Sequence, residues 1–118
     1  MARTAITPTT IVRTGDVDAG TAGIADGHKF TNTGRTFLRV VNGNAGATRD
    51  ITVQTPRTVD GLAVAELVVT VGTSATVLMG PFPTATFNRT TGADAGSIYM
   101  DYEATESDLT VEVYDLPL

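Results

Sequence analysis

Apolar and polar residues alternate with a period of two in several short segments of this chain. Residues 50–55 place Ile51 and Val53 on one face and polar side chains on the other. Residues 97–103 and 109–114 follow the same alternation. A period of two is the pattern of a β-strand with one buried face. These three segments are therefore predicted to be strands.

Other segments are apolar on both faces, which indicates strands nearer the middle of a sheet. They are residues 37–42, in which only Arg39 is charged, and residues 67–71. Residues 75–79 return after a short turn, and residues 85–88 are predicted to form one more short strand.

Turn-forming residues between neighbouring strands predict three hairpins. Residues 42–46, with the sequence Asn-Gly-Asn-Ala-Gly, would close the hairpin between strands 37–42 and 50–55. Residues 72–74 would close the second hairpin, and the acidic turn at 106–108 would join the last two strands.

Short strands separated by turns every 8–12 residues or so are typical of a β-sandwich or a small barrel. We expect an all-β, single-domain fold over residues 14–118, either a sandwich of jelly-roll-like form or a small barrel. It would contain about seven or eight short antiparallel strands and almost no helix, because no segment carries an apolar stripe at helical spacing. Residues 1–13 are predicted to be an extended N-terminal arm, since Pro8 disfavours a helix, with an edge strand at 10–12.

The composition and charge of the chain argue against several classes of binding partner. The 118 residues carry a net charge of −5, and the eight Lys and Arg residues are scattered singly, so we expect no nucleic-acid partner. No apolar run approaches the length of a membrane span, and no hydrophobic signal core follows Met1, so we expect no membrane partner. The absence of cysteine excludes disulfides, thiolate metal sites and thiol catalysis.

No catalytic constellation emerges from the residue types. The single histidine, His28, precedes a strand and is interpreted as a surface or turn-capping residue. Asp101, Glu103 and Glu112 would share the outer face of the last hairpin, where paired carboxylates could serve a glycosidase, but a solvated face is the preferred interpretation. Residues 16–20 match only the start of a calcium loop. We expect no enzyme, cofactor, metal or small-molecule substrate.

Shape and association remain as possible functions. The arm is polar and extended, and such arms gain order by adding as a strand to a neighbour's edge. The segment 80–84 contains two prolines and presents Phe82 either as a packing anchor for a partner or as a core residue. The candidate contact residues are Arg3, Thr4, Ile6, Pro8, Ile11, Val12 and Phe82.

Three runs within residues 26–88 resemble small structural proteins of tailed bacteriophages. They are residues 28–38, 41–43 and 80–83, with the sequences HKFTNTGRTFL, VNG and GPFP. Proteins of this kind include head decoration, or cement, proteins. The resemblance implies a protein of the virion exterior, assembled in the host bacterial cytoplasm, that stabilises the head. It would bind the major capsid protein and itself as a homo-oligomer, a homotrimer in the first instance.

Two alternatives stay open. The chain could be another virion part, such as a tail tube, a head–tail connector or a fibre base, which are also small β domains that polymerise. It could instead be a carbohydrate-binding module or glycosidase fragment that uses Asp101, Glu103, Tyr99 and Tyr114.

Overall fold

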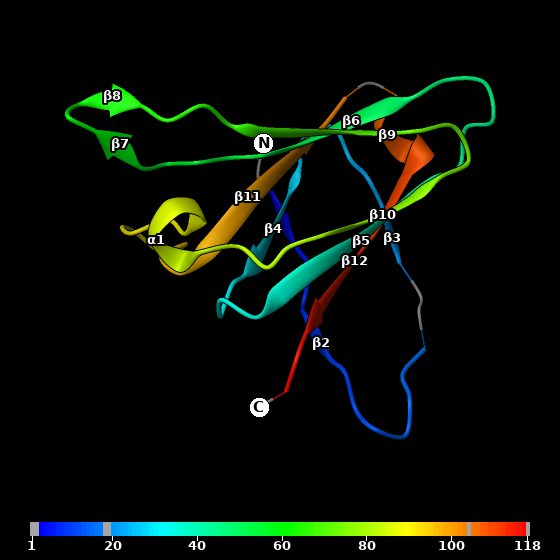
Figure 1. Cartoon of the computed structure of the whole chain (residues 1–118), viewed down its shortest axis with the longest axis horizontal. Helices are drawn as coiled ribbons and strands as arrows, with labels where there is room; N and C mark the ends of the chain where they lie inside the picture. The colour runs from blue at the N-terminus through cyan, green and yellow to red at the C-terminus, as the bar shows by residue number, and fades with distance from the viewer. Residues whose placement is uncertain (1–2, 18–19, 104, 118) are drawn as a thin grey trace.

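The alternating segments of the sequence fold into two five-stranded sheets that pack face to face (Figure 1). The computed structural model describes residues 3–17, 20–103 and 105–117. The expected all-β fold is confirmed, in the form of a sandwich. Most strand pairs are antiparallel, as expected, but β1 and β2 of the arm pair in parallel with their neighbours.

The first sheet, called the β11 sheet after its central strand, has the spatial order β1 (Thr4–Ala5), β4 (His28–Thr31), β11 (Ser97–Tyr102), β6 (Arg49–Val53) and β9 (Leu67–Val71). The second, called the β12 sheet, has the order β10 (Thr76–Met79), β5 (Thr36–Asn42), β12 (Leu109–Asp115) and β2 (Thr9–Thr10), with β3 (Thr21–Ala22) also paired to β12. A separate small hairpin consists of β7 (Thr58–Val59) and β8 (Leu62–Ala63).

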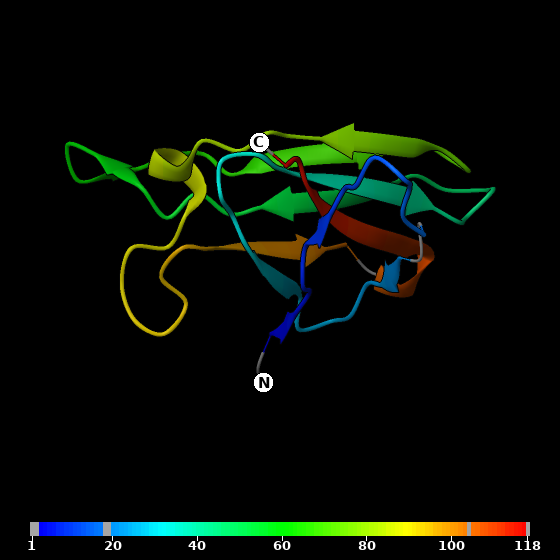
Figure 2. The same cartoon turned by 90° about the horizontal axis from the view of Figure 1, so that it is seen from below.

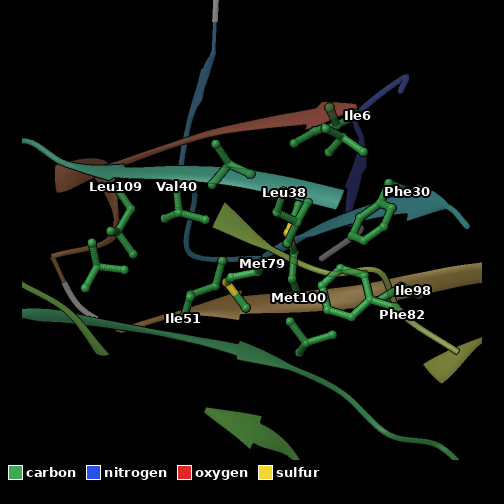
Figure 3. Close-up of a cluster of buried hydrophobic side chains, with 14 residues drawn as sticks. Ile6, Phe30, Leu38, Val40, Ile51, Met79, Phe82, Ile98, Met100 and Leu109 are labelled. Carbon is green, nitrogen blue, oxygen red and sulfur yellow. The ribbon is translucent and has the colours of Figure 1, made fainter. Parts of the chain in front are cut away.

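The inward residues of both sheets form one apolar core (Figure 3). Leu38 and Val40 from β5 meet Ile51 and Val53 from β6, and all four side chains are fully buried. Burying each such side chain stabilises the fold by about 1.5–3 kcal/mol relative to leaving it exposed. The period-two alternation of the sequence therefore identified the buried face of β6, β11 and β12 correctly. The interpretation of residues 67–71 as a strand nearer the middle of a sheet is wrong, because β9 is an edge strand in which Leu67 and Val68 are exposed.

The three predicted hairpins are wrong, although the strands that compose them are present. β5 and β6 lie in different sheets, and so do β9 and β10, and β11 and β12. Each turn carries the chain across the core to the opposite sheet, a connection typical of sandwiches. Alternation shows which residues face inward, but a strand in either sheet gives the same pattern.

Asn42 explains why the first turn crosses between the sheets. Its side chain is fully buried, and its amide Nδ2 donates to the carbonyl of Ala47 at 2.9 Å and to the carbonyls of Val71 and Gly72 at 3.2 Å. Its Oδ1 accepts the backbone N–H of Asn44 at 2.9 Å. This amide ties the end of β5 to the end of β9, and a tight hairpin turn would leave it buried without partners.

The strand predicted at 85–88 is also wrong, because residues Thr84–Phe87 form α1, a single helical turn. The backbone N–H groups of Thr86 and Phe87 donate to the carbonyl of Pro83. Phe87 packs edge-on against Phe82, with ring centroids 5.3 Å apart. Pro83 has a fixed φ that suits the start of a helical turn.

The described part of the N-terminal arm is extended, as expected, and lies against its own chain. Thr4–Ala5 pairs with β4, and Thr9–Thr10 pairs with β12 in the opposite sheet. Between them Ile6 is buried in the core, with only 8% of its surface exposed. The arm therefore joins the two sheets along one side of the sandwich, which we call the closed side. In Figure 2, β1 lies near the bottom of the molecule and β10 along the top.

Candidate interaction surface

The opposite side of the sandwich is formed by two edge strands. β9 is the last strand of the β11 sheet and β10 is the last strand of the β12 sheet. A turn over residues 72–75 joins them, so they lie on the same side, which we call the open side. Within residues 3–17, 20–103 and 105–117, no further strand pairs with either of them.

Backbone groups of β10 point outward on the open side. The N–H of Asn42 donates to the carbonyl of Ala75 at 2.9 Å, so Ala75 faces β5. Hydrogen-bonding positions alternate along an antiparallel pair. Val77 and Met79 therefore also face β5, whereas Thr76 and Leu78 direct their N–H and C=O groups away from the sheet.

The two strands of the open side contain no charged residue. Leu78 is 66% exposed on the outer face of the β12 sheet, and Val68 is 55% exposed on the outer face of the β11 sheet. Residues 67–88 contain no Asp, Glu, Lys, Arg or His. Natural edge strands are commonly protected from association by charged side chains or prolines. β9 and β10 lack both, which makes this side a surface suited to association.

A pocket of about 320 Å³ opens at the end of β10. It is mostly apolar and lies between the loop before β5, the segment after β10 and the C-terminal segment. Its lining residues are Gly34, Arg35, Phe37, Leu78, Met79, Gly80, Pro81 and Leu116. The exposed leucines at its rim, Leu78 and Leu116, extend the apolar surface of the open side.

Gly80, one of the lining residues, lies in close contact with β5. Its φ is +130°, a conformation that favours glycine, and a Cβ at this position would lie 2.9 Å from the Cβ of Phe37. Glycine therefore allows the chain to leave β10 directly against β5.

Arg3, the first of the predicted contact residues, is occupied on the closed side. Its Nη1 donates to Asp101 Oδ1 at 2.6 Å and to the carbonyl of Met100 at 3.0 Å. Its guanidinium also lies 4.5 Å from the centre of the Tyr99 ring. Burial tends to raise the pKa of Asp101, but the hydrogen bonds from Arg3 and Gln54 outweigh it and hold that pKa below its usual value. Arg3 anchors the arm to β11.

The other predicted contact residues of the arm divide into covered and exposed positions. Ile6 is a core residue, and Pro8 and Ile11 are half-buried. Thr4 and Val12 are exposed, Val12 to 46%. The side chains available to a partner are therefore those of Thr4 and Val12, and the side chain of Ile6 is not.

Phe82 is a core residue, the second of the two interpretations given for it. It is 2% exposed and packs between Phe30 and Phe87. The carbonyl of Phe82 accepts a hydrogen bond from the buried amide of Asn32 at 2.9 Å. Its side chain is not available as an anchor for a partner.

The interpretation of His28 as a surface residue is wrong. It is 1% exposed, on the inward face of β4, and its Nδ1 lies 2.6 Å from the hydroxyl of Tyr102. Burial lowers the pKa of His28 and raises that of Tyr102. The alternation could have found it, because His28 stands two positions before Phe30 and so shares its inward face.

Of the carboxylates weighed as a glycosidase pair, Glu112 is separated from Asp101 and Glu103. Asp101 lies on the outer face of the β11 sheet and Glu103 directly follows that strand, whereas Glu112 lies on the outer face of the β12 sheet, where it accepts the N–H of Gly20. Tyr114 is separated from Tyr99 in the same way. The four residues suggested for carbohydrate binding therefore do not share one face of the sandwich.

A polar cluster on the outer face of the β11 sheet was missed by the sequence reasoning. Tyr99 lies beside the guanidinium groups of Arg3 and Arg89, the latter 4.0 Å from the ring centre. Asp94 accepts hydrogen bonds from the Tyr99 hydroxyl and, at 2.9 Å, from Lys29 Nζ, and these bonds lower its pKa. The alternation of the sequence indicates which residues of β4 and β11 point outward. It does not indicate that the loop carrying Asp94 contacts them.

The partial calcium motif at residues 16–20 falls partly outside the described residues, which exclude Asp18. Asp16 accepts the backbone N–H of Val12 at 3.1 Å, the role of a turn residue. Across the described ranges, no group of three or more His, Asp or Glu side chains is placed to hold a metal ion. Over the same residues, no helix has the length and apolar character needed to cross a membrane.

Comparison of the chain with protein-family models, with curated proteins and with solved structures gave no match.

Proposed function

We propose that this chain is a structural protein of a tailed bacteriophage that binds the outer surface of the head and stabilises it. The proposal begins from the resemblance of residues 28–38, 41–43 and 80–83 to such proteins. In this role the chain binds the major capsid protein, and copies of the chain associate as a homo-oligomer. The resemblance implies a trimer.

The observation that best supports a role in assembly is the open side of the sandwich. It presents unpaired strand edges whose own residues are uncharged, and beside them a mostly apolar pocket that Arg35 also lines. The central parts of protein interfaces are depleted in charge and enriched in apolar side chains. Many weak contacts repeated over a shell give strong attachment without one tight site.

The arm packs against its own chain and so is not free to bind a partner along its whole length. Ile6 belongs to the core of its own chain, so deleting residues 1–13 would remove packing as well as any contact with the head. A surface substitution separates these effects. Val12 is exposed and Arg13 follows it on the same exposed segment, so both are accessible to the capsid.

Co-sedimentation with heads tests the proposal directly. Purified protein is mixed with phage heads that lack decoration and pelleted, and the bound fraction is measured as the protein concentration rises. Saturable binding at a fixed number of copies per capsid protein supports the proposal. The double variant Val12→Asp/Arg13→Asp, checked for unchanged thermal unfolding, should bind less if this part of the arm faces the head.

Absence of saturable binding to heads from several tailed phages would overturn the role in decoration. Binding to isolated tails or formation of rings of six or more copies would favour a tail tube, connector or fibre base instead. Light scattering of the free protein reports the ring size in that case.

A further inference from the structure

We infer that two copies of this chain associate through the open side, by antiparallel pairing of their β10 strands about a twofold axis at Val77. This contact goes beyond head binding and differs from the trimer that the resemblance implies, since it concerns the free protein in solution. It also identifies the chemistry of the partner, which is a second copy of the same uncharged edge.

The backbone of β10 fits this symmetric pairing. Thr76 and Leu78 both direct N–H and C=O groups outward, and Val77 lies midway between them. In an antiparallel pair centred on Val77, Thr76 of one copy stands opposite Leu78 of the other. Residues opposite each other at such positions exchange an N–H···O bond in each direction. The twofold axis repeats this exchange on the other side of Val77.

The charge distribution favours a second copy at this place. Each chain carries a net charge of −5, so two copies repel each other over most of their surface. Residues 67–88 carry no charge, and they include both edge strands of the open side. Two copies that meet along β10 therefore bring no charged side chain of their edge strands together, and the nearest charge in register is Arg39 on β5, opposite Leu78.

The exposed side chains also fit a pairing of this register. Leu78 is 66% exposed on the outer face of the β12 sheet. In the pair, it lies beside Thr76 of the second copy and diagonal to the Leu78 of that copy, and diagonal neighbours are within reach of long side chains. The pairing thus covers the most exposed apolar side chain of β10 from both copies.

A twofold contact needs only this one edge, because the same surface serves both partners. A threefold ring is heterologous and needs a second, different surface on the neighbouring copy. A contact centred on one short edge strand is smaller than the roughly 1,200–2,000 Å² of a standard stable interface. We therefore expect a dimer that dissociates on dilution, which repetition on a shell would reinforce.

Charge substitutions test both the surface and its register. Light scattering of the wild type should give the mass of two chains of 12.3 kDa at high concentration, falling towards one chain on dilution. Leu78→Lys should raise the dissociation constant at least tenfold, because it places the two lysines at diagonal positions. Thr76→Glu/Leu78→Lys should restore the dimer, since each glutamate then faces the lysine of the other copy. The control is Leu62→Lys on β8, a leucine 73% exposed away from the open side.

Cysteine cross-linking provides a second measurement that does not depend on a large effect on affinity. The chain has no cysteine, so Thr76→Cys and Leu78→Cys each introduce the only thiol. Under mild oxidation, a mixture of the two variants should form a disulfide-linked dimer much faster than either variant alone. Opposite positions in the pair lie within disulfide reach, whereas the diagonal positions are less favourable.

Each possible result either supports or overturns the twofold contact. A wild type that stays monomeric at all concentrations overturns the inference, and so does a dimer or trimer whose mass Leu78→Lys leaves unchanged. Equal cross-linking of the mixture and the single variants overturns the register. Light scattering is done without heads, so its failure leaves head binding to be decided by co-sedimentation, and failure of co-sedimentation leaves the twofold contact standing.

Discussion

The two lateral sides of this sandwich meet the same physical problem in different ways. Each side ends in edge strands whose outward backbone groups lack a partner within their own sheet. On the closed side, the arm adds β1 to one sheet and β2 to the other, and it places Ile6 in the core between them. On the open side, β9 and β10 remain uncovered and uncharged.

The difference shows how one chain can cover the strand edges on one side and still leave strand edges exposed on the other. The closed side is charged and its groups are paired, as the Arg3–Asp101 contact at 2.6 Å illustrates. An exposed strand edge without charge invites pairing with another chain. Confining that edge to one side limits association to one direction and leaves the other faces solvated.

The largest expected effect concerns the corner where the open side meets the pocket. Gly80→Ala should lower the free energy of unfolding by about 3 kcal/mol, because a side chain there is strained at φ +130° and collides with Phe37. Urea denaturation measures the change. Gly92→Ala is the matched control, since its φ is +77° but nothing lies within 4 Å of the added Cβ. Equal losses for the two variants would mean that the corner is not tightly packed.

A direct contrast between the two sides comes from equivalent truncations. Ile6→Ala should cost about 2–3 kcal/mol in stability, because it removes a buried side chain that lies between the sheets. Leu78→Ala on the open side should change stability by no more than about 0.5 kcal/mol, because that side chain is 66% exposed. Thermal and urea unfolding are measured at a concentration where the protein is monomeric. If Leu78→Ala lowers the free energy of unfolding as much as Ile6→Ala does, the side chain of Leu78 is covered and the open side is not exposed as described.

The smallest expected effect is a pH dependence on the closed side, where His28 pairs with Thr4 of the arm. The buried His28 has a pKa below its ordinary 6.5 in the folded protein, so the unfolded chain binds the proton more readily. Stability is then unaffected above the unfolded pKa and falls as the pH drops below it. The free energy of unfolding should therefore fall between pH 7 and 5.5, by no more than about 1.4 kcal/mol per pH unit, which is the limit for one proton.

The measurement is the urea midpoint at several pH values for the wild type and for His28→Gln. The variant should show a flatter pH dependence over this window, whatever its overall stability. The carboxylates whose pKa is lowered by hydrogen bonds, namely Asp94, Asp101 and Asp108, release their protons at lower pH. An unchanged slope in the variant would show that His28 does not titrate differently in the folded state.

Much of the strand pattern could be predicted from the sequence. The strand expected at 67–71 has the observed bounds, and those expected at 37–42 and 109–114 are each within one residue of the observed ends. Alternation was sufficient for 109–114, because that strand buries one face against the core. The all-β class follows from the same signal. The placement of 67–71 nearer the middle of a sheet was wrong, since that segment is apolar on both faces and yet forms an edge strand.

The partners of those strands could not be predicted. Whether 37–42 pairs with 50–55 depends on which sheet each joins, and that depends on contacts such as those of Asn42 with Val71 and Gly72. These contacts join positions about 30 residues apart in sequence, and no local pattern records them. The open side was missed for the same reason, since an edge strand is defined by what does not lie beside it.

Whether the position of a candidate contact residue could be predicted depended on whether the residues around it in the fold are also close to it in sequence. Phe82 sits in an uncharged apolar segment, which by itself fits both a core and an interface. Ile6 was assigned to the extended arm because Pro8 disfavours a helix there, although its side chain completes the core. A local signal for extended backbone says little about where a single apolar side chain on it lies.

The arm also constrains the order in which the molecule can be made. Thr9 pairs with Tyr114 and Ile11 donates its N–H to the carbonyl of Asp115, so segments more than a hundred positions apart form one ladder. During synthesis the arm emerges from the ribosome long before β12. The closed side can therefore form only once residues 109–115 have left the ribosome, whereas β9 and β10 are already made by then. The pairing of β2 with β12 must therefore be completed after most of the other strands have been made.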